Sequence, residues 1–274
     1  MQLHYFPTPE AANTLSTTEL RSRFLISDLF KSGSLTAHYT DLDRMIVGAA
    51  LPSGNSLELP AFKETGTSFF LERREIGILN LGSGGLVRVG GTAYELGYLD
   101  CLYVGQGERD VLFVNGSSGE AQFFFISTPA HAKHPTAVVR HSDLRTDPIG
   151  DPAKANRRRI NKLIHPDGLK SCQLVMGFTE FEPGSVWNTM PPHTHSRRTE
   201  IYLYFDLGSD VVFHVMGEPH ATRHLVVRDR EAVLSPAWSV HCGAGTGAYR
   251  FVWAMGGDNQ AFADMDAVPL NTLN

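Results

Sequence analysis

The sequence is poor in cysteine, in charged residues and in long apolar runs. Its three cysteines, Cys101, Cys172 and Cys242, are scattered and form no CxxC pair, which argues against a disulfide framework and favours a reducing, cytoplasmic location. Charged residues make up only 19% of the chain and the net charge is −5, so no basic field is present to attract nucleic acid. No window approaches the ~20 apolar residues of a membrane span, and the first seven residues do not resemble a secretory signal. We therefore expect no nucleic-acid or membrane partner.

Short apolar segments between glycine, proline, asparagine and aspartate fill most of the chain and predict an all-β fold. The 274 residues suit one large domain or two of ordinary size, and the apolar fraction of 42% can fill a core. Helix is expected only at 20–30, after a capping box formed by Ser16 and Glu19, and at 155–165. The expected strands are 45–51, 68–72, 77–81, 86–89, 111–114, 122–127, 172–181, 200–205, 211–215, 223–227 and 248–254.

A weak internal repeat divides the chain. Residues 73–83 resemble residues 197–209 with a small insertion, and Asp110 falls at the position of His241. Such a repeat indicates two similar β units in tandem. We expect an N-terminal extension and a barrel without metal in 1–140, a connection in 141–170, and a metal-binding barrel with its tail in 171–274.

The strongest functional signal is a set of three histidines and one glutamate. His193 and His195 stand two residues apart, so their side chains point to the same side of a strand. A barrel can bring Glu200 and His241 back to the same point. Three imidazoles and a carboxylate suit a divalent transition metal. In a chain with twelve histidines an HxH pair alone is weak, but the addition of Glu200 and His241 favours a metal site.

The pattern HxHx4E, followed by PxxxxH ending at His241, resembles the two motifs of the cupin superfamily. The sequence departs from these motifs in three ways. Gly184 lies farther than usual from the first histidine, Trp238 replaces a glycine, and Gly245 stands where many cupins have asparagine. The spacing of the four candidate ligands is nevertheless intact.

Longer segments resemble one cupin family more closely, the 4-deoxy-L-threo-5-hexosulose-uronate ketol-isomerases, also called 5-keto-4-deoxyuronate isomerases. The similarity runs from about Phe24 to the C-terminal tail and is carried by 70–75, 99–105, 156–162, 187–191 and 262–266. It implies a subunit of two cupin barrels (a bicupin), a homo-hexamer, and one zinc ion. The implied zinc ligands are His193, His195, Glu200 and His241, although other divalent ions suit the same ligands.

The resemblance also implies a reaction, the conversion of 5-dehydro-4-deoxy-D-glucuronate to 3-deoxy-D-glycero-2,5-hexodiulosonate in the breakdown of pectin and other polyuronates. An aldehyde with an adjacent hydroxyl becomes a ketone with an adjacent hydroxyl. A divalent metal bound to both oxygens would stabilise the charge of an enediolate as a Lewis acid. A metal-assisted hydride shift would need the same contacts, so the sequence leaves both routes open.

Candidate bases and proton donors lie on both sides of the metal motif. Glu180 and Glu182 share one face of a strand, and either can serve as a base. Tyr202 and Tyr204 share the face of Glu200 and can donate to substrate oxygens, or simply pack the barrel interior. Of the residues near the motif, those that we expect to be catalytic are Glu180, Tyr202 and Lys162.

A uronate substrate carries a carboxylate, for which arginine is the natural bidentate partner. Two arginines, Arg197 and Arg198, adjoin the ligands, and the connection contributes Arg157, Arg158, Arg159 and Lys162. Trp187 and Trp238 flank the two motif loops and can wall a pocket or pack the core. The residues that we expect to contact substrate are Arg158, Arg197, Arg198 and Trp187.

Two other functions fit the same motif. Three histidines and one glutamate also suit iron, copper or nickel, so an oxygen-activating cupin dioxygenase is one alternative. A non-catalytic sugar-binding cupin that keeps a structural metal is the other. The isomerase is distinguished from both by turnover without oxygen consumption.

Overall fold

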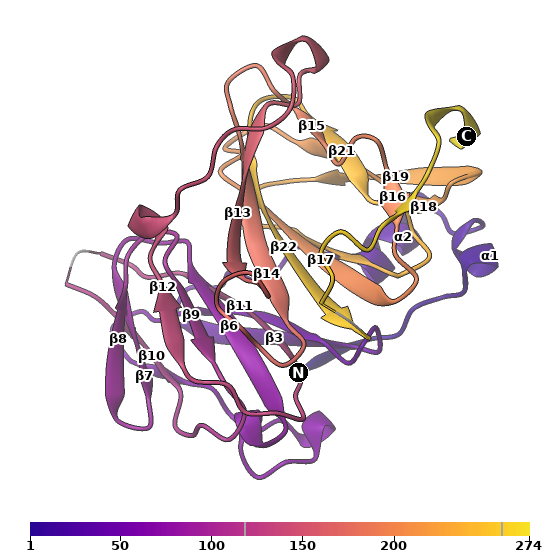
Figure 1. Ribbon diagram of the computed structural model, residues 1–274. Helices are drawn as coiled ribbons and strands as arrows, with labels where there is room; N and C mark the ends of the chain where they lie inside the picture. Colours follow the sequence, from indigo (N-terminus) through magenta and orange to yellow (C-terminus); the bar gives the residue numbers. More distant parts are fainter. Residues whose placement is uncertain (118, 259) are drawn as a thin grey trace. The chain divides into compact units, whose positions relative to one another are not determined.

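The computed structural model describes residues 1–117, 119–258 and 260–274, and the chain divides into two compact units. Unit 1 comprises Met1–His4, Asp28–Leu144 and Leu163–Val175, and unit 2 comprises Tyr5–Ser27, Arg145–Lys162 and Met176–Asn274. Strands dominate both units (Figure 1). No helix in the described ranges is long and apolar enough to cross a membrane.

Unit 1 consists of two antiparallel-rich sheets. The larger sheet has the strand order β1-β3-β4-β11-β6-β9-β12 and the smaller has the order β5-β10-β7-β8. The strands are β1 (Gln2–His4), β3 (Ser34–Thr40), β4 (Ile46–Leu51), β5 (Leu57–Glu58), β6 (Arg74–Asn80), β7 (Gly85–Val89), β8 (Thr92–Leu96), β9 (Cys101–Val104), β10 (Leu112–Asn115), β11 (Phe123–Pro129) and β12 (Ala137–Val139). Three 3₁₀ turns accompany them, η1 (Lys63–Thr65), η2 (Phe70–Glu72) and η3 (His141–Asp143).

The core of unit 1 lies between these sheets. Phe123 and Phe125 are alternate residues of β11 in the large sheet, and both rings pack on Phe113 of β10 in the small sheet. All three are fully buried. Alternate residues of a strand face the same side, so the apolar faces of the two sheets meet in a sandwich.

Unit 2 repeats this plan around the candidate site. Its larger sheet has the order β13-β14-β22-β17-β20-β2, its smaller sheet has the order β15-β21-β18-β19, and β16 pairs with β23 alone. The strands are β2 (Leu25–Ile26), β13 (Arg158–Ile164), β14 (Val175–Phe181), β15 (Trp187–Asn188), β16 (His193–Thr194), β17 (Arg198–Phe205), β18 (Val212–Glu218), β19 (Ala221–Val227), β20 (Ala232–Ser235), β21 (Cys242–Gly245), β22 (Arg250–Gly257) and β23 (Asp266–Ala267). The helices are α1 (Pro9–Ala12), α2 (Thr17–Phe24), η4 (Pro152–Lys154) and η5 (Leu270–Thr272).

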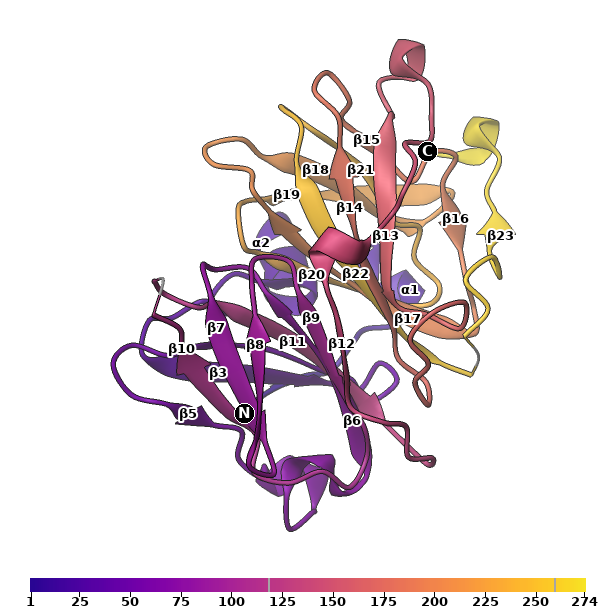
Figure 2. The same cartoon turned by 60° about the vertical axis from the view of Figure 1, so that its left-hand side comes forward.

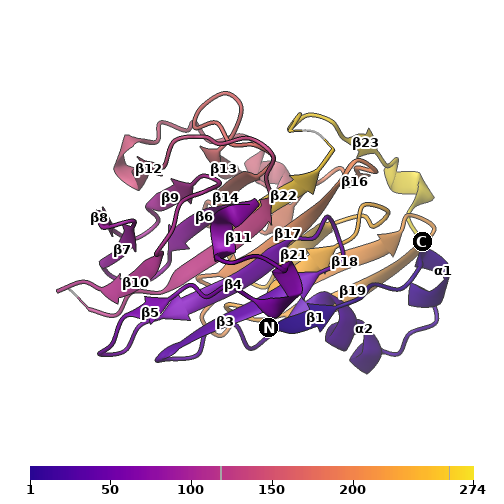
Figure 3. The ribbon, with the colours of Figure 1, turned by 90° about the horizontal axis from the view of Figure 1, so that it is seen from below.

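The N-terminal helix begins where the sequence predicts. The amide of Glu19 donates to Oγ of Ser16 at 3.3 Å, and the Ser16 amide donates to the Glu19 carboxylate at 2.8 Å, which completes the capping box. The helix ends at Phe24, earlier than expected, because residues 25–26 form β2 beside β20. Helix α2 contacts β19 and β20 of unit 2, and Figure 3 shows α2 near β19.

Two local predictions are wrong. The stretch 155–165 is mainly strand β13 and not a helix, because its side chains alternate in burial between Asn161, Lys162 and Leu163. Residues 68–72 contain the 3₁₀ turn η2 and no strand, and the Glu72 carboxylate folds back to accept a hydrogen bond from the amide of Ser68 at 2.7 Å.

Candidate active site

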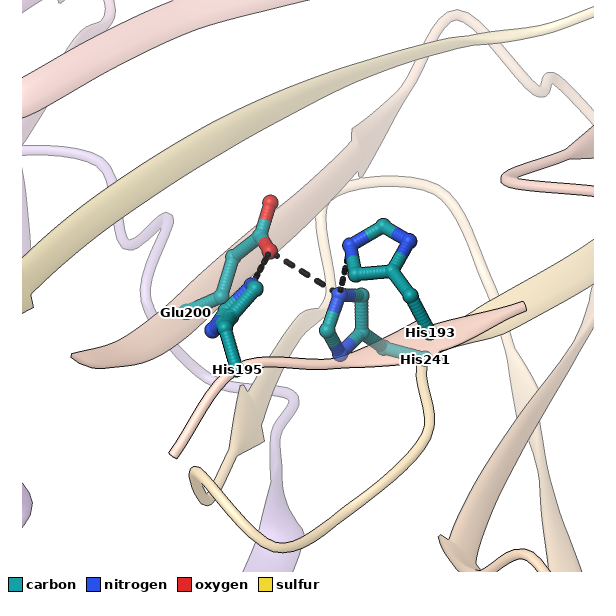
Figure 4. A group of neighbouring side chains, drawn as sticks. All are labelled: His193, His195, Glu200 and His241. Atoms are coloured by element: carbon teal, nitrogen blue, oxygen red, sulfur yellow. Dashed lines mark hydrogen bonds and ion pairs between the residues drawn. The ribbon is translucent and has the colours of Figure 1, made fainter. Parts of the chain in front are cut away.

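Four side chains from three segments of unit 2 converge on one point (Figure 4). His193 lies in β16, His195 follows β16, Glu200 lies in β17, and His241 immediately precedes β21. One donor atom from each lies within 4.8 Å of every other, and no other such group of histidine, cysteine or acidic residues occurs in the described part of the chain. The HxH spacing and the return of β17 and β21 therefore place the four candidate ligands together.

The distances between the donor atoms match those around a small divalent ion. Oε2 of Glu200 lies 3.0 Å from Nε2 of His195 and 3.2 Å from Nε2 of His241, whose Nε2 lies 3.0 Å from Nε2 of His193. Ligand atoms about 2.1 Å from a metal are about 3.0 Å apart at right angles and about 3.4 Å apart at the tetrahedral angle. The pocket between these atoms therefore has the dimensions of a metal site.

Backbone carbonyls orient two of the imidazoles. Nδ1 of His195 lies 3.0 Å from the carbonyl oxygen of Arg198, and Nδ1 of His241 lies 3.3 Å from that of Ser239. A carbonyl oxygen only accepts, so each Nδ1 carries the proton and each Nε2 presents a lone pair to the centre. Lone pairs that face one another and a carboxylate at about 3 Å repel unless a cation lies among them, so the donor set fits a metal ion.

The charge states also suit metal binding. Burial lowers the pKa of His241 to about 3 and that of His193 to about 4, against the attraction of Glu200. Burial alone would raise the pKa of Glu200, but His241, His195 and His193 lower it to about 2. Burial also works against the charged form of His195, whose pKa is nevertheless raised by its contact with Glu200. At neutral pH the site thus holds an ionised carboxylate and at least two neutral imidazoles.

Three of the four residues, His193, His195 and Glu200, line a cavity of about 360 Å³, a size that suits a small organic acid. Alternate residues of β22, Phe251, Trp253 and Met255, form one apolar wall. Gly177 of β14 makes room for the indole, because a Cβ there would lie 2.3 Å from Trp253. The cavity is therefore mostly apolar, with its polar groups concentrated at the ligand end.

Apart from the candidate ligands, only three ionisable groups line this cavity within the described ranges: Arg158, Arg198 and Tyr202. Arg158 of β13 donates to the carbonyl of Asn156 at 2.7 Å, and no described carboxylate pairs with it. Tyr202 follows Glu200 on the same face of β17 and is 2% exposed. Burial, reinforced by the Glu200 charge, raises its pKa far above the usual value, so its hydroxyl remains a donor.

The structure places the other expected catalytic residues away from the cavity. Glu180 accepts an ion pair from Arg250 at 3.2 Å, and Lys162 is exposed with its ammonium 5.3 Å from the ring centre of Phe262. Neither residue lines the cavity. Tyr204 lies one pleat below Tyr202, and its hydroxyl contacts Nδ1 of the buried His214 at 2.7 Å.

The remaining charged candidates are also engaged elsewhere. Glu182 pairs with Arg157 at 3.0 Å and with Arg159 at 3.2 Å. The pleat of the strand explains why Arg158 lines the cavity and its two neighbours do not, because successive side chains point to opposite faces. Trp187, 37% exposed, does not line the cavity.

The two arginines of the metal loop bind the C-terminal part of the chain. Arg197 pairs with Asp264 at 2.7 Å and with Asp266 at 3.2 Å. Arg198 is 1% exposed and donates to the carbonyls of Ala261 and Phe262. Arg198 also borders the cavity, whereas Arg197 does not.

Sequence reasoning missed most of the apolar lining. Phe251, Trp253 and Met255 alternate along one late strand, a period-two signal that marks a shared face. Thr179 carries no such signal, because it is the one lining residue that β14 contributes, and the spacing of Phe262, Met265 and Ala267 fits neither strand nor helix periodicity.

Comparisons with known proteins give one consistent result. The KduI/IolB family model matches residues 28–269. The chain is 69% identical to the 4-deoxy-L-threo-5-hexosulose-uronate ketol-isomerase of Opitutus terrae over 274 residues, with 100% of both chains covered. It is 50% identical to the enzyme of the same name from Bacillus subtilis strain 168, again over 100% of both.

Solved structures add information on the fold alone. An IolB-like protein from Salmonella typhimurium LT2 superposes with a TM-score of 0.72 at 13% identity, covering 89% of this chain and 96% of that one. A cupin 2 conserved barrel domain protein from Leptotrichia buccalis gives a TM-score of 0.50 at 10% identity, with 84% and 92% covered. The fold is therefore mostly β and cupin-like.

Proposed function

We infer that this chain, which belongs to the KduI/IolB family, is a metal-dependent ketol-isomerase that converts 5-dehydro-4-deoxy-D-glucuronate to 3-deoxy-D-glycero-2,5-hexodiulosonate. It is an isomerase, as its full-length relatives are named. The substrate and the metal dependence are the proposal. The single observation that supports it is the convergence of His193, His195, Glu200 and His241. The first three line a cavity that also contains an arginine for which the described residues provide no carboxylate partner.

The residues that would hold the metal are these four. A divalent ion bound there supplies Lewis acidity, which stabilises negative charge on the carbonyl and hydroxyl oxygens of an α-hydroxy aldehyde. We propose zinc, since three imidazole nitrogens and one carboxylate are among its usual ligands. The protein's part is to keep His193 and His241 neutral through burial, and to orient His195 and His241 through the carbonyls of Arg198 and Ser239.

Arg158 is the group that we propose for the substrate carboxylate. It lines the cavity on β13 and is half-buried, and its guanidinium donates to the backbone carbonyl of Asn156 at 2.7 Å while no carboxylate in the described ranges pairs with it. A guanidinium presents several donors in a plane that matches a carboxylate. Anchoring one end of the acid there would leave its aldehyde end to reach the ligand cluster.

Tyr202 and the apolar walls would complete the site. The Tyr202 hydroxyl stays protonated and lies on the same strand face as Glu200, so it can donate to a substrate oxygen near the ligands. Phe251, Trp253 and Met255 exclude water from the same space. Exclusion of water strengthens each electrostatic contact with the substrate.

The architecture and assembly implied by family resemblance are carried forward as proposals. We propose two cupin-type barrels in tandem, in 1–140 and 171–274 with a connection in 141–170, and a cytoplasmic homo-hexamer. Supporting the tandem arrangement, strands β4-β11-β6-β9 of unit 1 follow the same order as β14-β22-β17-β20 of unit 2. Light scattering coupled to size-exclusion chromatography would test the hexamer, and a smaller species would reject it.

One experiment tests the proposed reaction. Metal-assayed protein is incubated with the unsaturated-uronate breakdown product and followed by NMR in H₂O and in D₂O, with an oxygen electrode alongside. We expect loss of the aldehyde hydrate, appearance of the ketone and no oxygen uptake. Deuterium in the product indicates proton exchange through an enediolate, and its absence indicates a hydride shift. Oxygen uptake would instead support a dioxygenase, and no change would support a binding protein.

A further inference from the structure

The C-terminal segment 260–268 forms one wall of the cavity. Phe262, Met265 and Ala267 from this segment line the cavity opposite the strands of the large sheet. Phe262 packs on Trp253, another wall residue, with ring centres 5.1 Å apart. Figure 2 shows β23 of this segment beside β16, which carries His193. The end of the chain therefore shapes the space in front of the ligand cluster.

Two backbone contacts join the described end of this segment to the chain around His193. Strand β23 has two residues, with Ala267 opposite His193, and the amide of Val268 donates to the carbonyl of Pro192 at 3.0 Å. A two-residue strand pair is marginal without further support. Side-chain contacts from elsewhere in unit 2 therefore add to its support.

Two consecutive arginines supply that support. Arg197 holds the carboxylates of Asp264 and Asp266, at 2.7 and 3.2 Å. Arg198 donates to the carbonyls of Ala261, of Phe262 at 3.1 Å, and of Asp264 at 3.4 Å. One arginine thus binds the side chains of the segment and the other binds its backbone.

The same two residues belong to the loop that positions a candidate ligand. The carbonyl of Arg198 orients His195 through the 3.0 Å contact with Nδ1, while its guanidinium reaches the wall. The amide of Asp258 donates to the carbonyl of Arg197 at 2.8 Å, which ties the loop to the strand that precedes the wall. The same loop therefore holds both the wall segment and the candidate ligand His195.

From this geometry we propose that Arg197 and Arg198 are positioning residues. They hold segment 260–268 as the wall that fixes the substrate in the cavity, and they do not bind the substrate carboxylate. The proposal rests on the proposed isomerase function for its effect on turnover, but the position of the wall is measurable without turnover. Arg197 is the better residue to test, because Arg198 is fully buried and its replacement can unfold the loop.

The test compares Arg197→Gln with Arg250→Gln in the metal-loaded protein. Arg250 is a matched control, because it also holds two carboxylates, those of Glu180 and Asp206, has a similar exposure and lies outside the cavity lining. Hydrogen exchange of the amides of 263–268 reports on the wall without any substrate. We expect faster exchange there in Arg197→Gln and unchanged exchange in Arg250→Gln.

Kinetics then report on the role of the wall. We expect KM to rise about five- to twentyfold in Arg197→Gln, as loss of two exposed ion pairs implies, with kcat within about twofold and metal content unchanged. Arg197→Lys should recover part of this effect. Asp264→Asn should add little to Arg197→Gln, because both changes break the same pair.

The outcomes separate the two proposals. An inactive wild-type protein rejects the proposed function but leaves the exchange measurement intact. Unchanged exchange in Arg197→Gln overturns the wall attachment, and faster exchange with unchanged KM overturns its role in holding substrate. A loss of metal in Arg197→Gln overturns the assignment as well, since the residue would then act on the ligand loop.

Discussion

Truncation of one candidate ligand is the sharpest test of the metal site, and a second buried histidine provides the control. His195 and His214 are both buried, at 2% and 0% exposure. His195 places Nε2 3.0 Å from Glu200, whereas His214 contacts the Tyr204 hydroxyl at 2.7 Å and is outside the ligand group. Both changes to alanine leave a cavity of the same size, so they differ mainly in the loss of a metal donor.

The expected effect follows from mass action. Loss of an outer-shell partner alone weakens metal binding about 10–100-fold, so removal of a ligand itself should cost at least about 100-fold. With metal at about 100 times the wild-type Kd, metal stabilises the wild type by about 2.7 kcal/mol. At the same concentration the His195→Ala protein gains only about 0.4 kcal/mol. For a chain of this size the wild-type gain corresponds to a Tm increase of about 5–11 °C.

The assay measures Tm by differential scanning calorimetry with and without added Zn²⁺, and bound metal by mass spectrometry after gel filtration. His195→Ala should lose most bound metal and nearly all of the metal-dependent increase in Tm. His214→Ala should have a lower Tm in both conditions but keep the increase. Full metal occupancy in His195→Ala, or equal metal loss in both variants, would refute the ligand assignment.

Three further predictions follow from individual contacts. Arg158→Gln should raise KM for the uronate about 10–100-fold through loss of a charge-assisted hydrogen bond, while steady-state assays of Arg159→Gln, whose partner is Glu182, should show little change. Gly177→Ala should lower Tm and kcat/KM, because its Cβ would lie 2.3 Å from Trp253, whereas Gly168→Ala, with no atom nearer than 4.0 Å, should leave both unchanged. Burial lowers the pKa of His38 from 6.5 to about 4, together with the nearby charges of His4 and Lys31 and against the attraction of Asp28. As the pH falls, the unfolded chain therefore binds a proton at this histidine before the folded chain does. The free energy of unfolding should fall by about 3 kcal/mol as the pH drops from 6.5 to 4. Urea titrations across this range should show a smaller fall for His38→Gln, and an equal fall would contradict the assignment.

Sequence spacing was sufficient to predict the convergence of the ligands for a simple reason. His193 and His195 obey strand periodicity, and Glu200 follows after one short turn, so little long-range information is needed. The prediction that His241 joins them required the further assumption that later strands of the barrel bring it back beside the first three residues. The pairing of β17 with β20, in which Glu200 lies opposite Ser235, supplies that return, because His241 follows β20 after a short turn.

The arginines could not be assigned from sequence, because their partners lie far along the chain. Arg197 pairs with residues 67 and 69 positions away, and no local pattern links them. Arg158 lies among three arginines, and only the strand pleat separates it from neighbours that face Glu182. The prediction of a helix at 155–165 does not separate Arg158 from its neighbours in this way, because a helix would distribute the three guanidinium groups around its axis.

The repeat explains why the candidate metal site found among the described residues lies in unit 2 and has no counterpart in unit 1. Glu75 occupies in β6 the place of Glu200 in β17, and it is fully buried. Its two oxygens accept from the amides of Cys172, Gln173 and Leu174, each at 2.7 Å, and from the Tyr103 hydroxyl at 2.6 Å. A carboxylate has about four lone-pair sites, so these donors leave no site for a cation.

Glu200 meets the opposite environment. Its carboxylate lies within 3.2 Å of the Nε2 atoms of His195 and His241, and a neutral imidazole that donates its Nδ1 proton to a backbone carbonyl has no further proton to donate. A buried carboxylate that faces acceptors is costly unless a cation compensates it. The two units thus place the same side chain at the same position of the same strand, and the neighbours decide its role. Amide donors make Glu75 a structural anchor for residues 172–174, and the neighbouring imidazoles make Glu200 a candidate metal ligand.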